Sequence, residues 1–515
     1  MDRSKSLKKI AKKKIWDLII IGGGSSGLGI AVDSASRGYK TLLIEKHDFS
    51  KGTSSRSTKL VHGGVRYLQN GDISLVVEAL RERGIMRKNA PHLVRDLSFV
   101  IPSYDWWNSP FYGIGLKIYD MMSGKLGLGP STLLSRDEII KLIPNVKKKG
   151  LKGGVIYHDG QFDDARMAIS LAQTAENHGA TLINYFGVED LIKEKEMISG
   201  IIARDYIENK SYKIMSKGVI NATGVFSDSI TNLDIKKRNR TIVPSQGVHI
   251  VLDKSFLAGN HAIMVPHTTD GRVLFAVPWN NYVIVGTTDT QIKKIEVEPK
   301  PLKEEVEFIL KNAGTYMKSA PTFSDIKSIF AGLRPLAAPE KNEKATKEIS
   351  RHHKVTVSTS GLISILGGKW TTYRKMAEDT VNTARSVAGL QDRECITHNL
   401  TIHGYDYSSN WKNPIHFYGT DIEKIENLDS NGNSSISEKF FISKNQIIWS
   451  IRNEMAMNLE DVMARRTRSL FLDAKESLRI APKVIEIMAN EMKKNTNWIK
   501  NEITNFEKVV KNYVM

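Results

Sequence analysis

A glycine-rich turn near the start of the chain is the first group of residues with the spacing needed to bind a ligand. The pattern G-x-G-x-x-G is met by the run Gly22-Gly23-Gly24-Ser25-Ser26-Gly27. In such turns the first glycine, Gly22, permits the sharp bend, Gly24 lets the backbone approach a pyrophosphate, and Gly27 lets a helix and a strand pack closely. Glu45 lies at the distance expected for an acid that accepts hydrogen bonds from an adenosine ribose. The turn therefore predicts dinucleotide binding, without separating FAD from NAD.

The elements around this turn predict its position in a fold. Asp17–Ile21 is a short apolar run of strand type, Leu28–Arg37 has helical spacing, and Thr41–Glu45 is a second strand-like run. Strand, helix and strand in this order form a βαβ unit with parallel strands. The helix would begin at the glycines, where its free N–H groups and positive dipole end favour phosphate. The sequence therefore predicts an α/β fold.

Three further segments have the composition of flavin-binding loops. A hydroxyl-rich loop covers Thr53–Lys59, a strand ends in Ala222-Thr-Gly224, and another strand runs into Gly367-Gly368 before a helix that begins near Thr371. That last helix N-terminus could face the pyrimidine end of an isoalloxazine. The predicted cofactor-binding residues are Gly22, Gly24, Gly27, Glu45, Thr53, Ser54, Ser55, Thr58, Lys59, Gly63, Gly64, Ala222, Gly224, Gly367, Gly368 and Thr371.

Composition excludes several classes of protein. The chain has 515 residues, of which 41% are hydrophobic and 25% charged, values typical of a globular protein rather than a disordered or fibrous one. Its single cysteine, Cys395, allows no internal disulfide and no cysteine-based metal cluster, and suits a reducing compartment. No run of about 18 apolar residues is present, so no membrane-spanning helix is expected. Because a single cysteine cannot form a zinc-ribbon or iron–sulfur site, we also predict no bound metal.

The net charge of +18 is concentrated in part at the N-terminus, where residues 1–14 hold seven lysines and arginines. We expect these residues to form a basic tail, either solvated or attracted to anionic lipid. No nucleic-acid recognition module follows it, so no nucleic-acid partner is expected.

The rest of the chain divides into a core, residues 15–395, and a C-terminal helical domain, residues 396–515. In the core, FAD-binding segments are expected at about 15–100, 150–240 and 355–395, with substrate-side segments at about 100–150 and 240–355. Strand-like stretches such as Ile242–Leu252 dominate the second substrate-side segment, which predicts a separate sheet there. Beyond Cys395, apolar residues recur at three- and four-residue steps from Ile447 to Leu459, which favours helices.

The chain resembles the FAD-dependent, quinone-linked glycerol-3-phosphate dehydrogenases along nearly its whole length. The matching segments are Asp17–Gly27, Thr53–Leu68, Asp163–Arg166, Asn221–Gly224, Gly286–Asp289, Gly332–Pro335 and Gly367–Arg374. The resemblance implies a Rossmann-type FAD-binding domain with an interleaved antiparallel-sheet substrate domain, similar to the glycine and D-amino-acid oxidase group, and a C-terminal all-α domain.

The resemblance also implies substrate contacts, at Arg66, Tyr67, His249, Arg334, Arg351 and Lys369. A phosphomonoester dianion needs several cationic donors, which the arginines and the lysine would supply. Other interpretations of single positions remain open. Arg351 could lie in an exposed turn, Lys369 at the surface of a helix start, and Tyr67 in ordinary core, and His249 could be a structural histidine in a strand.

The implied reaction is oxidation of sn-glycerol 3-phosphate to dihydroxyacetone phosphate, with hydride moving from C2 to flavin N5. His249 is the first candidate for the base, and Arg334 would polarise the developing alkoxide. Electrons would pass to a membrane quinone. The alternatives are an oxidase that uses O2 and produces H2O2, an amino-acid oxidase, and a basic RNA-binding or scaffold protein.

The stretch Ser103–Ser131 is unusually aromatic and carries few charges. Tryptophan and tyrosine favour the bilayer interface, so this segment could dip into one leaflet, and a buried aromatic helix is the equal alternative. On the first interpretation the enzyme is cytoplasmic and peripheral on the cytoplasmic face of the membrane. The oligomeric state stays open, with a homodimer among the options.

Overall fold

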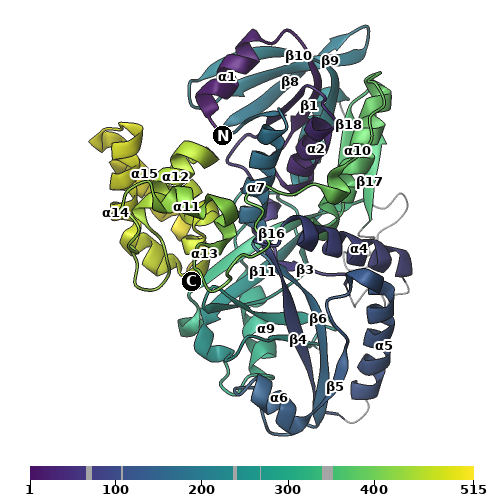
Figure 1. Cartoon of the computed structure of the whole chain (residues 1–515), viewed down its shortest axis with the longest axis vertical. Helices are drawn as coiled ribbons and strands as arrows, with labels where there is room; N and C mark the ends of the chain where they lie inside the picture. The colour runs from purple at the N-terminus through teal and green to yellow at the C-terminus, as the bar shows by residue number, and fades with distance from the viewer. Residues whose placement is uncertain (65–71, 106–107, 236–239, 267, 339–351) are drawn as a thin grey trace.

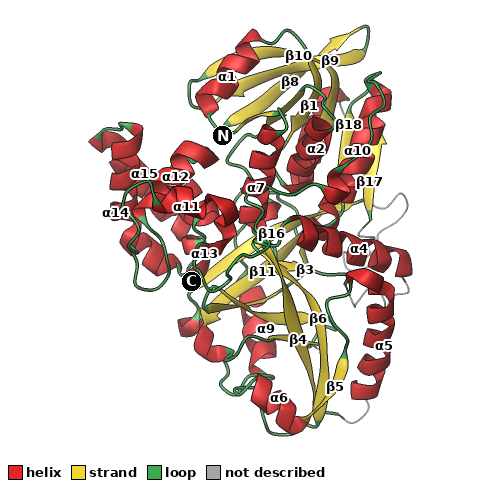
Figure 2. Cartoon of the chain, in the orientation of Figure 1, coloured by secondary structure: helices red, strands yellow, loops and turns green. Residues whose placement is uncertain are grey.

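The chain folds into two sheets that lie end to end, with a group of helices packed at one side (Figure 1). The computed structural model describes residues 1–64, 72–105, 108–235, 240–266, 268–338 and 352–515. Figure 2 shows that strands run through both ends of the molecule, whereas the C-terminal part is helical. This arrangement confirms the predicted α/β fold class, with a parallel cofactor sheet, an antiparallel second sheet and a helical C-terminal region.

The first sheet is mainly parallel and contains the glycine turn. Its strands are, in spatial order, β17 (His353–Val357), β18 (Ile363–Gly367), β10 (Lys210–Asn221), β1 (Trp16–Ile21), β2 (Thr41–Ile44) and β7 (Thr181–Ile183). β1 pairs in parallel with β2 on one side and β10 on the other, so its apolar run is buried at the centre. β8 (Phe186–Glu194) and β9 (Met197–Asp205) extend β10 as an antiparallel meander.

Three helices pack with this sheet around one apolar core: α2 (Ser25–Ser36), α7 (Asp164–Asn177) and α10 (Tyr373–Val387). The segment from β1 through α2 to β2 is the predicted βαβ unit, and its strands are parallel. α8 (Ser227–Asp234) follows β10.

The second sheet is mainly antiparallel. Its strands are, in spatial order, β15 (Thr290–Gln291), β11 (Ile242–Asp253), β14 (Tyr282–Gly286), β13 (Leu274–Trp279), β12 (Ala262–Val265), β4 (Val94–Ser103), β6 (Gly153–Phe162) and β3 (Leu60–Val61). β16 (Ser328–Ala337) pairs with β11, and β5 (Thr132–Ser135) pairs with β6. The helices associated with this half are α4 (Ile73–Asn89), α5 (Asn108–Ser123), α6 (Arg136–Leu142) and α9 (Lys303–Gly314).

The segment boundaries between the two sheets differ from those expected. β3, β4 and β6 all belong to the second sheet, although they lie at least partly within the segments expected for the FAD-binding half. These strands belong to the second sheet because β4 pairs with β6 over its whole length, from Val94 opposite Phe162 to Ser103 opposite Gly153. The chain therefore crosses to the second sheet near residue 60 and returns near residue 163.

Most of the C-terminal helices share a core with the second sheet. They are α11 (Ile422–Glu426), α12 (Lys444–Glu454), α13 (Ser469–Leu472), α14 (Ala474–Met492) and α15 (Thr496–Val510), with a π-helical turn at Asp461–Arg466. Phe330 of β16 and Trp279 of β13 are buried in the same apolar cluster as Phe471 and Val484. The helical interpretation of Ile447–Leu459 is right only as far as Glu454, because Met455 takes a left-handed conformation that ends α12.

The basic N-terminus is a docked helix and not the tail that we expected. α1 (Arg3–Lys12) buries Ile10 in the core beside β7, and its Arg3 guanidinium lies 2.7 Å from the buried carboxylate of Asp205. The lysines lie on the exposed face of the helix, and the opposite face packs against the first sheet. The net charge of the segment does not reveal this amphipathic pattern. None of the helices in the described ranges is long and apolar enough to cross a bilayer.

Candidate cofactor and substrate site

The glycine turn has the tight geometry that a pyrophosphate site requires. Gly22 has a φ of +110°, and a Cβ added there would lie 2.6 Å from the carbonyl oxygen of Ala222. A Cβ on Gly27 would collide with the carbonyl oxygen of Gly22. α2 begins directly after Gly24, with no side-chain cap and no acidic residue in its first turn. The positive end of this helix dipole is therefore available to a phosphate.

Glu45, the residue directly after β2, is partly buried beside the turn. Its carboxylate accepts hydrogen bonds from the backbone N–H of Gly23 at 2.6 Å and of His47 at 2.8 Å. Burial raises the pKa of Glu45, and the two backbone hydrogen bonds oppose that rise. The carboxylate thus ties the glycine turn to the loop that follows β2, and it lines the same cavity as the turn.

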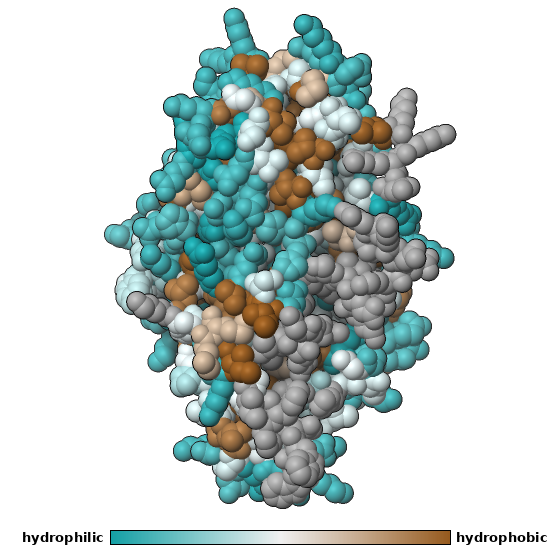
Figure 3. All heavy atoms as spheres, turned by 90° about the vertical axis from the view of Figure 1, so that its right-hand side faces the viewer, coloured by the Kyte–Doolittle hydropathy of each residue, from teal (hydrophilic) through white to brown (hydrophobic). Residues whose placement is uncertain are grey.

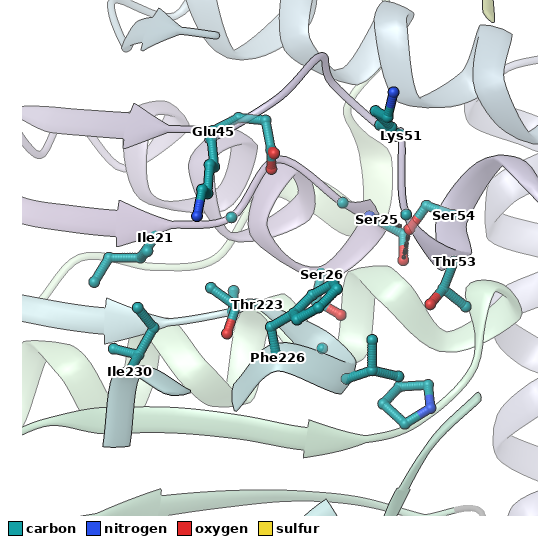
Figure 4. A pocket seen from close by; sticks show the side chains of 18 of the residues that line it. Ile21, Ser25, Ser26, Glu45, Lys51, Thr53, Ser54, Thr223, Phe226 and Ile230 are labelled. Carbon is teal, nitrogen blue, oxygen red and sulfur yellow. Dashed lines mark hydrogen bonds between the residues drawn. The ribbon is translucent and has the colours of Figure 1, made fainter. Parts of the chain in front are cut away.

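That cavity, of about 460 Å³, lies along the carboxyl ends of β1, β2, β10 and β18 (Figure 4). It passes from Glu45 and Ile21 at one end, across Ser25, Ser26 and Thr223, to Thr53 and Ser54. Gly367, Gly368 and Lys369 also line it. A crevice outside the carboxyl ends of parallel strands is where open α/β sheets bind their ligands.

His249 lies on β11, where the second sheet approaches the hydroxyl-rich loop Thr53–Lys59. We refer to residues 53–59 as the cofactor loop. The ring of His249 is buried and stacks on Phe330, with 4.9 Å between the ring centroids. Its Nε2 lies 2.8 Å from the hydroxyl oxygen of Thr58. Burial, together with the charges of Lys59 and Arg334, holds the pKa of His249 well below its usual value. The imidazole is therefore neutral at neutral pH and able to accept a proton.

Arg334 lies on the neighbouring strand β16, opposite Ser245 of β11. Its guanidinium donates hydrogen bonds to the carbonyl oxygens of Thr288 at 3.0 Å and Gln246 at 3.3 Å. The next residue, Pro335, lines the cofactor cavity. The hydroxyl of Thr53 donates to the carbonyl oxygen of Leu333 at 2.6 Å, so the strand that carries Arg334 is joined directly to the cofactor loop.

Comparison with known proteins agrees with this geometry. A family model described as FAD dependent oxidoreductase matches residues 17–374, and one described as the C-terminal domain of alpha-glycerophosphate oxidase matches residues 362–498. A mitochondrial "Probable glycerol-3-phosphate dehydrogenase" of Dictyostelium discoideum is 38% identical over 96% of this chain and 84% of the relative. The mitochondrial glycerol-3-phosphate dehydrogenase of Mesocricetus auratus is 37% identical over 95% of this chain and 72% of the relative.

The solved structure of glycerol-3-phosphate dehydrogenase from Bacillus halodurans, complexed with FAD, superposes on all of this chain and on 98% of that one, with a TM-score of 0.81 and 28% identity. The chain belongs to the FAD-dependent oxidoreductase family. Within it the chain groups with the glycerol-3-phosphate dehydrogenases, and its cofactor is FAD. The family and the cofactor implied by the sequence resemblance are thereby confirmed.

The residues of the cavity fit FAD. The uncapped N-terminus of α2 is suited to bind a pyrophosphate, and the partly buried carboxylate of Glu45 is suited to accept hydrogen bonds from a ribose. At the other end, Gly367 and Gly368 both have positive φ values, and Lys369 leads into the turn that begins α10, again without a side-chain cap. Such a bend lets the backbone approach a flat ring closely.

The predicted cofactor residues divide into two groups by position. Those that line the cavity are Gly22, Gly24, Glu45, Thr53, Ser54, Ala222, Gly224, Gly367 and Gly368. Those that do not line it are Gly27, Ser55, Thr58, Lys59, Gly63, Gly64 and Thr371. Gly27 acts behind the turn, where α2 packs on β1, as its proposed role requires. Contact with FAD stays a prediction for the others of this second group.

Lys59 has a clear alternative partner. Its ammonium lies 2.6 Å from the carboxylate of Asp164 and 2.8 Å from the carbonyl oxygen of Ser55, with no exposed surface. Arg468 lies 2.9 Å from the same carboxylate. Burial lowers the pKa of Lys59 to about 7, although Asp164 opposes that shift. The Lys59 side chain is therefore part of a buried ion cluster that joins the cofactor loop to α7 and the C-terminal helices.

Of the predicted substrate residues, Lys369 lines the cavity, and His249 and Arg334 do not. Arg66, Tyr67 and Arg351 lie outside the described residues. Sequence reasoning missed the loop between β2 and Thr53, of which Lys46, His47, Ser50, Lys51 and Gly52 line the cavity. The only signal was continuity: the loop joins two segments that were both assigned to the cofactor.

Proposed function

We propose that the enzyme oxidises C2 of sn-glycerol 3-phosphate to the ketone of dihydroxyacetone phosphate and passes the electrons to a membrane quinone. FAD supplies the two-electron acceptor, with N5 receiving the hydride from C2. The observation that carries this proposal is the position of His249 and Arg334. Both lie on strands of the second sheet that are hydrogen-bonded to the cofactor loop, at Thr58 and Thr53. A substrate between these side chains and the cavity would meet a proton acceptor and a cation together.

His249 takes the proton of the C2 hydroxyl in this proposal. Its depressed pKa keeps the ring neutral, so one ring nitrogen carries a free lone pair. The Nδ1 atom is buried and has no hydrogen-bond partner in the part of the chain that the structure describes. Stacking on Phe330 and the bond to Thr58 fix the plane of the ring. A base held this way can remove the proton as the hydride leaves C2.

Arg334 stabilises the negative charge that develops on the C2 oxygen. Its guanidinium is held by the carbonyl oxygens of Thr288 and Gln246 and by the hydroxyl oxygen of Thr287 at 3.2 Å. A cation fixed before the reaction needs little reorganisation in the transition state, which is where such charges contribute most.

The phosphate is assigned to Lys369 together with Arg66, Tyr67 and Arg351. Lys369 is supported by its position on the cavity wall, and the other three by the sequence resemblance. A dianion is bound more tightly by several fixed cations than by one, and arginine adds orientation through its two parallel N–H groups.

Oxygen is the alternative electron acceptor. The family model for residues 362–498 is described by the name of an oxidase, so the same substrate chemistry could end in H2O2. Peroxide production in air-saturated buffer separates the two acceptors. The quinone proposal expects peroxide at a small fraction of the rate with a soluble quinone analogue, and stoichiometric peroxide would contradict it.

Membrane contact is proposed for the side of the molecule formed by α4, α5 and β5. Met121 is 81% exposed and Leu133 is 62% exposed there, with Ile73, Val77 and Ile118 also exposed. Figure 3, which views this side, shows several separate apolar patches on it. The basic helix α1 lies at the opposite end of the molecule (Figure 1), so the two features do not form one surface.

Flotation with anionic liposomes tests this membrane surface. Met121→Ser with Leu133→Ser should lower the bound fraction severalfold, as should Trp106→Ser with Trp107→Ser at two positions outside the described residues. Tyr407→Ser, at a residue 86% exposed in the C-terminal region, should leave binding unchanged. Equal binding by all three variants would remove the proposed role of this surface.

Anaerobic bleaching of the bound flavin tests the substrate directly. We expect sn-glycerol 3-phosphate to bleach the flavin absorbance within seconds, because it offers both the secondary alcohol and the phosphate. Glycerol lacks the phosphate and D-alanine lacks the alcohol, so both should leave the absorbance unchanged at the same concentration. Bleaching by D-alanine, or equal bleaching by glycerol, would overturn the proposed substrate.

A further inference from the structure

The loop between β2 and Thr53 forms one wall of the cofactor cavity. Lys46, His47, Ser50 and Lys51 line the cavity. The backbone N–H of Ser50 donates to the carbonyl oxygen of Gly23 at 2.9 Å, which joins the loop to the glycine turn. We refer to residues 46–52 as the cofactor loop wall. Any shift of this wall would therefore move both the glycine turn and the side chains that face the cofactor.

The back of this wall is held by the C-terminal helices. Asp48, which has no exposed surface, accepts hydrogen bonds from Arg466 Nη1 at 2.6 Å, Arg466 Nη2 at 2.9 Å and Arg465 Nε at 2.5 Å. Both arginines are buried. A carboxylate that accepts hydrogen bonds from two guanidinium groups has little freedom to rotate or move, because each charge-assisted hydrogen bond restricts the orientation of the carboxylate.

A second contact holds the wall three residues further on. Lys51 Nζ lies 2.6 and 2.8 Å from the two carboxylate oxygens of Glu460, and Glu460 in turn accepts from Arg465 at 2.8 Å. Lys51 lines the cavity, whereas Glu460 does not. The charged cluster therefore reaches from the C-terminal helices to a side chain on the cavity wall.

The arginines come from the π-helical turn Asp461–Arg466. Two consecutive residues of this turn, Arg465 and Arg466, contact the same carboxylate, that of Asp48. Asp461 accepts from Arg465 at 2.7 Å and from the hydroxyl of Tyr185 at 2.6 Å, so the turn is itself fixed on both sides. π-Helical turns are rare and occur frequently at functional sites.

Stability alone does not account for so many buried charges. Replacing a buried ion pair by apolar residues of similar volume is often neutral or stabilising, so such a pair is weak evidence for a stabilising role. We propose that Glu460, Arg465 and Arg466 are positioning residues that fix the cofactor loop wall in its FAD-binding conformation. They act through Asp48 and Lys51 and do not touch the cofactor. The C-terminal helices then support the FAD site from behind its wall without lining the cavity.

This arrangement implies reciprocal coupling. If docking of the C-terminal helices tightens FAD binding, bound FAD must stabilise that docking by the same free energy. The proposal rests on the assignment of FAD to the cavity.

The test compares FAD affinity in two matched variants, Glu460→Gln and Glu491→Gln. Glu460→Gln removes the charge that holds Lys51 and Arg465 without changing volume. Glu491→Gln removes an equivalent charge from the partly exposed pair with Arg452, also among the C-terminal helices. The dissociation constant is read from the rise in FAD fluorescence on serial dilution of the holoenzyme, and the melting temperature is measured with and without excess FAD.

We expect Glu460→Gln to weaken FAD binding about tenfold and to reduce the increase in melting temperature that FAD produces. Glu491→Gln should leave both unchanged. Arg466→Lys keeps the positive charge but cannot donate the two hydrogen bonds that Arg466 makes to Asp48. This variant should also weaken FAD binding, and it provides a second test if Glu460→Gln does not fold.

A lower melting temperature with an FAD affinity within twofold of wild type, in whichever variants fold, would show that the cluster is merely structural and would overturn the proposal. Wild-type protein that takes up no FAD would instead overturn the assignment of the cavity.

Discussion

The two sheets contribute to the site in different ways. In the parallel sheet, the cavity is shaped by backbone at the ends of β1, β10 and β18, where Gly22, Gly224 and Gly367 take positive φ values. In the antiparallel sheet, the proposed chemistry belongs to two side chains, His249 and Arg334, held by strand register. Changes to the first sheet should therefore alter FAD binding, and changes to the second should alter turnover while FAD stays bound.

The largest effect is expected at Gly27. A valine side chain there would collide with the carbonyl oxygen of Gly22 and push α2 away from β1. Gly27→Val should yield protein without FAD, or no folded protein, as read from the flavin absorbance of the purified chain. Gly115→Ala, in α5 where a Cβ meets no atom within 4 Å, should retain full FAD content. Stoichiometric FAD in Gly27→Val would contradict the packing argument.

The ion cluster that joins the loop Thr53–Lys59 to α7 and the C-terminal helices should have the next largest effect. Asp164→Asn leaves the buried cations Lys59 and Arg468 without their counter-charge, and breaking a buried pair costs about 3–5 kcal/mol. The free energy of unfolding in urea measures this loss. The control Asp96→Asn breaks a more exposed pair with Arg87, and should cost about 0–1 kcal/mol. Similar losses of unfolding free energy in both variants would show that burial does not increase the contribution of the cluster to stability.

A smaller effect is expected at Glu45. Glu45→Gln removes a charged acceptor from the N–H groups of Gly23 and His47 and from the ribose, so FAD affinity should fall about tenfold, which corresponds to about 1.4 kcal/mol. Fluorescence titration with FAD measures the change, with Glu208→Gln at an exposed position as the control. An unchanged FAD affinity would remove Glu45 from the cofactor site.

The smallest effect concerns pH. Burial lowers the pKa of His92 to about 4, below its usual value of 6.5. The unfolded chain therefore binds a proton that the folded chain does not between those values, and stability is lost as the pH falls below 6.5. From pH 7.5 to 5.5 His92 should account for about 1 kcal/mol.

Urea unfolding at the two pH values tests this loss. His92→Asn should reduce the pH dependence, and the exposed His398→Asn should not. Equal pH dependence in wild type and His92→Asn would contradict the assignment.

The parallel half could be predicted because its signals are local. The glycine turn, both flanking strands and Glu45 all lie between residues 16 and 45, and each has a characteristic composition. The order of strands, the glycines of β18 and the family resemblance extended this prediction to the FAD cavity.

The contacts made by the C-terminal helices could not be predicted in this way. Arg466 and Asp48 are separated by 418 positions, and in the sequence each is an ordinary charged residue of the kind usually found at the surface. Arg3 is a similar case, since only the fold brings it to Asp205. Buried ion pairs depend on tertiary packing, which charge and periodicity do not encode.

The measurement that most directly tests the division between the two sheets is flavin reduction in His249→Ala. Stopped-flow mixing with sn-glycerol 3-phosphate gives the rate of bleaching, and the absorbance before mixing gives the FAD content. We predict full FAD content and a reduction rate lowered about 10²–10⁴-fold, with His261→Ala in the same half of the molecule unchanged. A wild-type rate in His249→Ala, or loss of its FAD, would contradict the account.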